Sequence, residues 1–343
     1  INDFIQGIIM LVGIVAVILA VLNVHGGFTE SLNQLSQIPS ETAPGMAGAF
    51  TSFFGPDPIN LLGVVILTSL GTWGLPQMIH KFYTVKNEKT IKTGTIISTV
   101  FALIIAGGSY FMGGFGRLFF EGEAPAGGFD SIVPTMLNTL SDLLIAIVII
   151  LVLSASMSTL SSLVITSSST FTIDFLKGIF FPKMGNKTQM LVIRVLCAVF
   201  ILISVLLALN PNSMISSLMS VSWGALAGAF LGSFLYGLFW KGTTRAGVWA
   251  GFISGVVITV FGLILTLTGT VLPAPFELLN SPLNLGAFAI VFSLVIVPLV
   301  SVLTPKLPKQ HLEQAFACYD ETIVTQHKFM LEKEEEEYID GNG

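Results

Sequence analysis

Charged residues are scarce in this sequence. Of its 343 residues, 20 are Asp or Glu and 15 are Lys or Arg, whereas 53% are hydrophobic. Soluble domains carry about 25% charged residues, so this composition excludes a water-soluble globule and predicts a polytopic membrane protein in contact with the lipid bilayer. The formal net charge of −5 comes largely from an acidic run near residues 334–337 and gives no indication of a nucleic-acid partner.

The patterns of known catalytic and metal centres are also missing. Cys197 and Cys318 form no disulfide framework or metal spacing, and the sequence has no HExxH, GxGxxG, P-loop or G-x-S-x-G motif. Carboxylates near the apolar segments are limited to Asp142 and, at the margins, Asp3 and Asp174, which leaves no intramembrane acid/base pair. These absences argue against an enzyme or a cofactor, and the lack of a ring-forming filter repeat argues against a channel.

Long apolar runs are what the chain has instead. Apolar windows of about 20 residues predict an all-α membrane protein with eight transmembrane helices. They lie near residues 4–22, 60–80, 94–116, 138–165, 190–209, 214–239, 246–268 and 284–303. The polar connection over residues 23–60 is expected to carry short surface helices. Because the chain begins at Ile1 rather than Met, with a span almost at once, we expect a fragment whose N-terminal part is absent.

The basic residues set the expected orientation. Lysines and arginines follow the second, fourth, sixth and eighth spans, whereas the intervening connections hold only Arg117. By the positive-inside rule, the even-numbered exits and the C-terminus lie in the cytoplasm of a multi-pass cell-membrane protein. Residues 1–305 then form the transmembrane domain, and residues 306–343 form a cytoplasmic tail with a short helix and an acidic end.

The fourth span is rich in hydroxyls, with the sequence SASMSTLSS at residues 154–162. On a helix, Ala155, Ser158 and Thr159 stand at i, i+3 and i+4 and share one face. A carbonyl and two hydroxyls there would offer a small cation neutral oxygens, and sodium is the natural candidate. The alternative is that the small residues let helices pack closely and the hydroxyls bond to carbonyls one turn earlier.

The second span carries helix-breaking residues. Gly71, Gly74 and Pro76 lie within six residues and should open the hydrogen-bond ladder near the middle of the membrane. An unwound turn at that depth is tolerated where it is buried in protein or lines a wet cavity, as in secondary transporters. The alternative is a proline-kinked packing helix. The candidate solute contacts beside the break are Thr68, Thr72 and Trp73.

These motifs resemble the sodium:solute symporter family and, within it, the sodium/proline symporters. The resemblance rests on residues 71–82, 154–162 and 240–251, on Asp3 and Gln6 of a D-x-x-Q opening, and extends to about residue 265. It implies a LeuT-like fold of thirteen helices with two inverted five-helix repeats. The eight spans would be the last eight, and the missing N-terminal helices of the same protein would supply the other half of each binding site.

The resemblance also implies roles for single residues. The Ala155 carbonyl, Ser158 and Thr159 correspond to sodium ligands, and Asp3 to an acidic residue implicated in sodium coupling. Thr68, Thr72 and Trp73 align with solute-lining positions. The two threonines stand where the proline transporters carry an aromatic pair, and Leu75 replaces a glutamine before Pro76, which leaves the solute open.

The function implied is sodium-coupled import of a small organic solute, such as proline or another amino acid, by alternating access. Two other classes remain open. A proton-coupled or uncoupled carrier would share the architecture, and a solute-binding membrane sensor would bind solute without moving it across the membrane. An enzyme is not expected, and sodium would serve as the coupling ion rather than as a cofactor.

Overall fold

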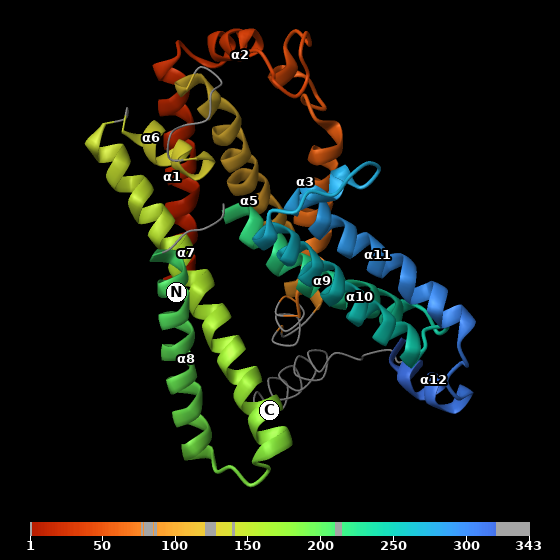
Figure 1. Ribbon diagram of the computed structural model, residues 1–343. Helices are drawn as coiled ribbons and strands as arrows, with labels where there is room; N and C mark the ends of the chain where they lie inside the picture. The colour runs from red at the N-terminus through yellow and green to blue at the C-terminus, as the bar shows by residue number, and fades with distance from the viewer. Residues whose placement is uncertain are drawn as a thin grey trace, which may run out of the picture. The chain divides into compact units, whose positions relative to one another are not determined.

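The computed structural model describes residues 2–76, 78, 85, 88–120, 128–138, 141–209 and 215–319 (Figure 1). The side chains of Asn2, Asp3, Ser158, Ser216 and Cys318 lie outside that description. Over these residues, every regular element is a helix. The chain forms two compact units, which are considered separately: unit 1 comprises Ile1–Val64 and Thr95–Met219, and unit 2 comprises Val65–Gly94 and Ser220–Gly343.

Seven helices of the described residues are long and apolar enough to cross a membrane. These stretches are Phe4–Val24, Lys89–Phe119, Asp142–Phe180, Asn186–Leu209, Ser217–Phe239, Arg245–Thr268 and Pro282–Leu303. They correspond to seven of the eight predicted spans. The eighth, expected near residues 60–80, is not one continuous helix: α3 (Pro58–Trp73) has 16 residues, about 24 Å at 1.5 Å per residue, short of the roughly 30 Å of a bilayer core.

Unit 1 is built from four long helices joined by shorter elements. Its long helices are α1 (Asn2–Val24), α5 (Glu88–Phe115), α7 (Asp142–Thr170) and α8 (Asn186–Leu209). Short elements lie between them: α2 (Phe28–Gln37), η1 (Ala49–Thr51), η2 (Gly116–Phe119), η3 (Phe129–Ser131) and α6 (Ile132–Leu137). The elements α2 and η1 confirm the short helices expected over residues 23–60.

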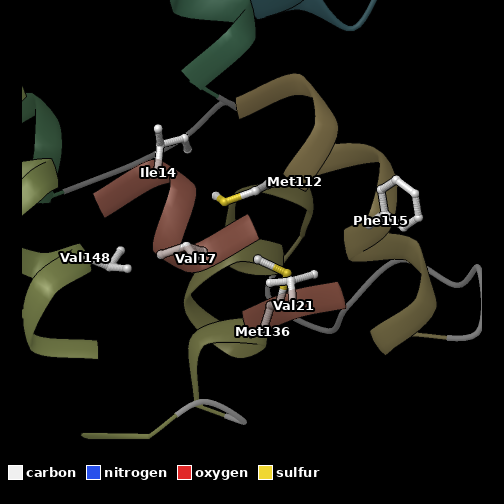
Figure 2. Close-up of a cluster of buried hydrophobic side chains, with 7 residues drawn as sticks. All are labelled: Ile14, Val17, Val21, Met112, Phe115, Met136 and Val148. Atoms are coloured by element: carbon white, nitrogen blue, oxygen red, sulfur yellow. The ribbon is translucent and has the colours of Figure 1, made fainter. Parts of the chain in front are cut away.

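The core of unit 1 gathers side chains from four helices. Figure 2 shows Ile14, Val17 and Val21 of α1 together with Met112 and Phe115 of α5, Met136 of α6 and Val148 of α7. The three α1 residues follow helical spacing and so share one buried face. Glycines bring the helices close, because a Cβ on Gly108 would lie 2.7 Å from Cγ1 of Ile14.

The fourth predicted span was placed too short. It was expected over residues 138–165, but α7 runs to Thr170 and continues as a π-helix, η4 (Phe171–Phe180). The hydroxyls near its end bond back along the helix: Thr172 Oγ1 donates to the Ser168 carbonyl at 2.7 Å. A hydroxyl that satisfies itself in this way does not end an apolar helix.

Unit 2 contains the end of α3 and helices α9 (Ile215–Phe239), α10 (Arg245–Thr268) and α11 (Pro282–Leu303), followed by α12 (Lys309–Phe316) and η6 (Ala317–Tyr319). A 3-10 turn, η5 (Glu277–Asn280), precedes α11. Helix α12 confirms the short helix predicted in the tail. Small residues let α9 and α11 pack closely. A Cβ on Gly224 would lie 2.9 Å from Cα of Gly286, and a Cβ on Gly232 would lie 2.6 Å from Oγ of Ser293.

Candidate functional site

The hydroxyl-rich part of α7 is helical, as predicted. Ala155 and Thr159 lie four residues apart on one face; Ala155 is half-buried and Thr159 is exposed. The Thr159 hydroxyl makes no hydrogen bond with any residue that the structure describes. The side chain of Ser158 and that of Asp3 lie outside the described residues, so the predicted set is only partly placed.

Of the other hydroxyls of α7, Ser161 behaves as the packing alternative requires and Ser168 does not. Ser161 Oγ donates to the Met157 carbonyl at 2.7 Å. Ser168 is fully buried, and its Oγ has no hydrogen-bond partner among the described residues. These two residues bear on the packing alternative and do not test the predicted ion site.

Two faces of α7 are covered within unit 1. On one, a Cβ on Gly13 of α1 would lie 2.5 Å from Cδ1 of Leu151 and 3.5 Å from Cγ2 of Ile147. On the other, Cys197 Sγ of α8 lies 4.0 Å from the Val164 carbonyl. Ala155 stands one turn beyond Leu151, so it continues the face that α1 covers. Ala155 thus lies toward the α1 side of α7 rather than the α8 side.

The predicted break in the second span is present. Helix α3 ends at Trp73, Gly74 and Leu75 are not helical, and Pro76 is helical again. The Gly74 N–H still donates to the Leu70 carbonyl at 3.3 Å, whereas proline has no N–H to continue the ladder. The remainder of the motif, residues 77 and 79–82, lies outside the described residues.

The proposed solute-lining residues stand beside this break. Thr72 Oγ1 donates to the Ser69 carbonyl at 2.9 Å, and Thr68 Oγ1 donates to the Val65 carbonyl at 3.5 Å. Both threonines are half-buried, and the Trp73 side chain is 67% exposed. A hydroxyl that donates along its own helix keeps acceptor lone pairs for a ligand, so these contacts are compatible with solute binding.

The opposite side of the α3 end packs against α9 and α11. A Cβ on Gly71 would lie 3.2 Å from Cε3 of Trp223 and 3.8 Å from Cδ1 of Ile290. Leu75 is 3% exposed. One side of the break therefore packs against α9 and α11, whereas Trp73 is exposed.

A pocket in unit 2 was not predicted. It has a volume of about 220 Å³ and lies between the start of α9, the end of α10 and the start of α11. Its polar lining includes Ser220, Thr259, Thr266 and Asn280. None of the predicted site residues lines it. The signal in the sequence was weak, because polar residues spread over two helices and the turn before α11 reveal a shared cavity only once their packing is known.

Among the described residues, no group of three or more His, Cys, Asp or Glu side chains could hold a metal ion. The candidate cation ligands predicted from the sequence are neutral oxygens of α7. A carbonyl and hydroxyls suit a small, hard, monovalent cation, because they provide dipoles without burying a carboxylate.

Comparison with known proteins adds an independent line of evidence. A family model described as "Sodium:solute symporter family" matches residues 1–255. The sodium/proline symporter of Salmonella typhimurium is 26% identical over 267 residues, which is 76% of this chain and 51% of that protein. The sodium/proline symporter of Staphylococcus aureus is 28% identical over 280 residues, which is 76% of this chain and 50% of that protein. The chain thus spans about half the length of the curated relatives it matches.

Proposed function

Because this chain belongs to the sodium:solute symporter family, we propose that the protein is a sodium-coupled symporter that imports a small organic solute by alternating access. The family match carries the proposal, since it covers both α7 and the break after α3. It agrees with an all-α polytopic membrane protein and with a transporter rather than an enzyme. Two of its relatives are named sodium/proline symporters, which makes proline the first solute to test.

In this proposal, sodium binds on α7. The Ala155 carbonyl and the hydroxyls of Ser158 and Thr159 act as ligands, and Asp3 couples the ion to the transport cycle. The half-buried Ala155 and the exposed Thr159 hydroxyl support this assignment.

The solute binds at the break after Trp73. Oriented N–H and C=O groups are available at helix ends, the threonine hydroxyls of Thr68 and Thr72 can accept hydrogen bonds, and the Trp73 ring can cover an apolar part of the solute. The threonines replace bulkier side chains expected from the proline transporters. A solute larger than proline would have room there, so the screen described below includes other amino acids.

The sodium gradient supplies the driving force. One sodium ion entering through a membrane potential of about 100 mV releases roughly 2.3 kcal/mol. Since about 1.4 kcal/mol corresponds to a factor of ten, the potential alone supports accumulation of a neutral solute by about fifty-fold. The basic residues after the even-numbered spans put the C-terminus in the cytoplasm, so that uptake is directed toward the side of the tail.

A thermal-shift screen of the natural full-length protein tests the proposal. Proline, other amino acids, organic acids, vitamins and sugars are each added in sodium chloride and in choline chloride at fixed pH. A coupled symporter gains stability from its solute in sodium and much less in choline, because each ligand favours binding of the other. Equal stabilisation in both salts would instead indicate an uncoupled or proton-coupled carrier, or a sensor.

A further inference from the structure

The pocket in unit 2 is large enough for a small organic molecule. It lies where α9 begins, α10 ends and α11 begins, and these three helices lie side by side (Figure 1). Its volume is about 220 Å³, whereas a cavity of about 150 Å³ already holds a molecule the size of benzene. A bare cation would leave most of this space empty.

The lining of the pocket is neutral. Among the residues that the structure describes, those around the pocket include no charged and no aromatic side chain. A charged ligand would lose its hydration there without meeting an opposite charge, which is costly. The volume and the lining together favour a neutral ligand.

The pocket hydroxyls can accept hydrogen bonds from a ligand. Thr259 Oγ1 and Thr266 Oγ1 each donate to the carbonyl four residues earlier on α10, at 2.9 Å. Ser220 Oγ of α9 donates to the Pro282 carbonyl. A hydroxyl has one hydrogen and two lone pairs, so each oxygen keeps acceptor capacity after its hydrogen is used. These side chains therefore suit a ligand that donates hydrogen bonds.

Asn280, at the end of η5, adds a donor. Its Oδ1 accepts from the Leu272 N–H at 2.8 Å, and its Nδ2 donates to the Leu272 carbonyl at 3.1 Å. The amide nitrogen carries two hydrogens, so a second one remains for a ligand. Leucine side chains form part of the remaining wall: Leu265, Leu279 and Leu285. A short carbon chain that bears several hydroxyls matches this combination of acceptors, a donor and apolar surface.

The proposed orientation places the pocket on the extracytoplasmic side. Lys241 and Arg245 lie at the connection between α9 and α10, which the positive-inside rule assigns to the cytoplasm. Helix α10 has 24 residues and is therefore about 36 Å long. Thr266, near its other end, then lies close to the level of the outer lipid headgroups.

We propose that this pocket binds a small neutral polyol. The hydroxyls of Ser220, Thr259 and Thr266 accept hydrogen bonds from the polyol, and the Asn280 amide donates one. A free polyol and the glycerol moiety of a phosphatidylglycerol headgroup offer the same chemistry. The inference goes beyond the proposed function, because binding here requires neither sodium nor the transported solute.

Glycerol is the probe for the test. The natural full-length protein is placed in phosphatidylcholine nanodiscs in choline chloride, and saturation transfer from the protein to glycerol is followed by NMR over a glycerol titration. Thr266→Val removes an acceptor and keeps the shape of the side chain, whereas Thr266→Leu also enlarges it. Thr99→Val is the matched control, because Thr99 Oγ1 of α5 likewise donates to the carbonyl four residues earlier, at 2.8 Å.

The parent protein is expected to show saturable transfer to glycerol. Thr266→Val should raise the half-saturating glycerol concentration about fivefold, as the loss of one hydrogen bond implies. Thr266→Leu should abolish the saturable part, and Thr99→Val should match the parent.

The lipid composition distinguishes the two sources of the polyol. If phosphatidylglycerol in the nanodiscs weakens glycerol binding and phosphatidic acid does not, the occupant is the lipid headgroup. If glycerol binds equally well with either lipid, the occupant is a free polyol. Both results support the shared chemistry.

The proposal is overturned if the parent shows no saturable transfer in phosphatidylcholine nanodiscs, as expected of a pocket that holds only water. It is also overturned if the parent and both Thr266 variants have the same glycerol affinity. Melting temperatures measured alongside identify a variant that fails to fold, and Thr266→Val alone decides if Thr266→Leu does so. Sodium binding is unchanged in every one of these outcomes, so the proposed ion site is tested separately.

Discussion

Gly74, at the break after α3, lies directly against Ala227 of α9. A Cβ on Gly74 would lie 2.5 Å from Cα and 2.6 Å from Cβ of Ala227. The atoms in the way are backbone and a short side chain, neither of which can rotate aside. The backbone of the break thus touches its neighbour without a side chain between them.

Gly74→Ala is therefore expected to damage the protein severely. Overpacking of a tight interface costs about 1–3 kcal/mol, and here the break must shift away from α9. We expect a melting temperature lowered by several degrees and solute uptake reduced at least about tenfold. Both can be measured on purified protein, by thermal unfolding and in proteoliposomes.

Gly107→Ala is the matched control for this change. Gly107 lies within helix α5, and a Cβ there meets no atom within 4 Å. Replacing a helical glycine by alanine stabilises by about 0.5–1 kcal/mol where space allows. Equal stability and uptake in the two variants would show that contact with Ala227 does not constrain the break.

Trp73 and Thr72 are expected to affect solute binding more than stability. Trp73 is 67% exposed, so Trp73→Leu removes little packing, and Thr72→Val keeps the shape of its side chain. Each should raise the solute concentration for half-maximal binding by about tenfold, since a ring contact or a hydrogen bond to the solute is lost. Isothermal titration with the solute found in the screen measures this.

Trp249→Leu provides the comparison for Trp73. Trp249 of α10 is also largely exposed, at 54%, but stands away from the break in the sequence. The Trp249→Leu variant should leave the solute affinity unchanged. If Trp73→Leu and Thr72→Val do so as well, the break has a structural role only.

Two of the contacts between the tail and the region around the end of α9 involve Tyr319 and Phe316. Tyr319 Oη donates to the Leu238 carbonyl at 2.9 Å, and Lys241 Nζ lies 5.4 Å from the centre of the Phe316 ring. A hydrogen bond contributes about 1 kcal/mol, so Tyr319→Phe should speed hydrogen exchange in α12 about fivefold. Tyr110→Phe, an exposed tyrosine on α5, is the control. Unchanged exchange in α12 would mean that other contacts hold the tail.

Hydropathy predicted most of the fold because a membrane demands long apolar helices whatever their packing. The break after Trp73 was predictable for a similarly local reason, since Gly71, Gly74 and Pro76 weaken one stretch of helix. The end of α7 was not predictable in this way. Ser168 and Thr172 are polar, yet both are buried in the structure and Thr172 donates back to the Ser168 carbonyl, so they do not end the helix.

The candidate site was predictable only in part. The spacing of Ala155 and Thr159 placed them on one face of a helix, but spacing cannot say which neighbour that face meets. The pocket beside Ser220 depends likewise on packing, since Gly262 makes room for the Leu285 side chain, whose Cδ2 would lie 1.8 Å from a Cβ.

Uptake into proteoliposomes tests the central claim that a sodium ion on α7 drives solute entry. The natural full-length protein and its Ser158→Ala and Thr159→Ala variants are compared, with Thr99→Val, a hydroxyl change on α5, as control. We predict that uptake by the parent protein follows an imposed sodium gradient and disappears in choline. We also predict that the half-saturating sodium concentration rises about tenfold or more in both α7 variants and does not change in the control. Uptake that proceeds equally well in choline, or an unchanged sodium dependence in both α7 variants, would contradict the account.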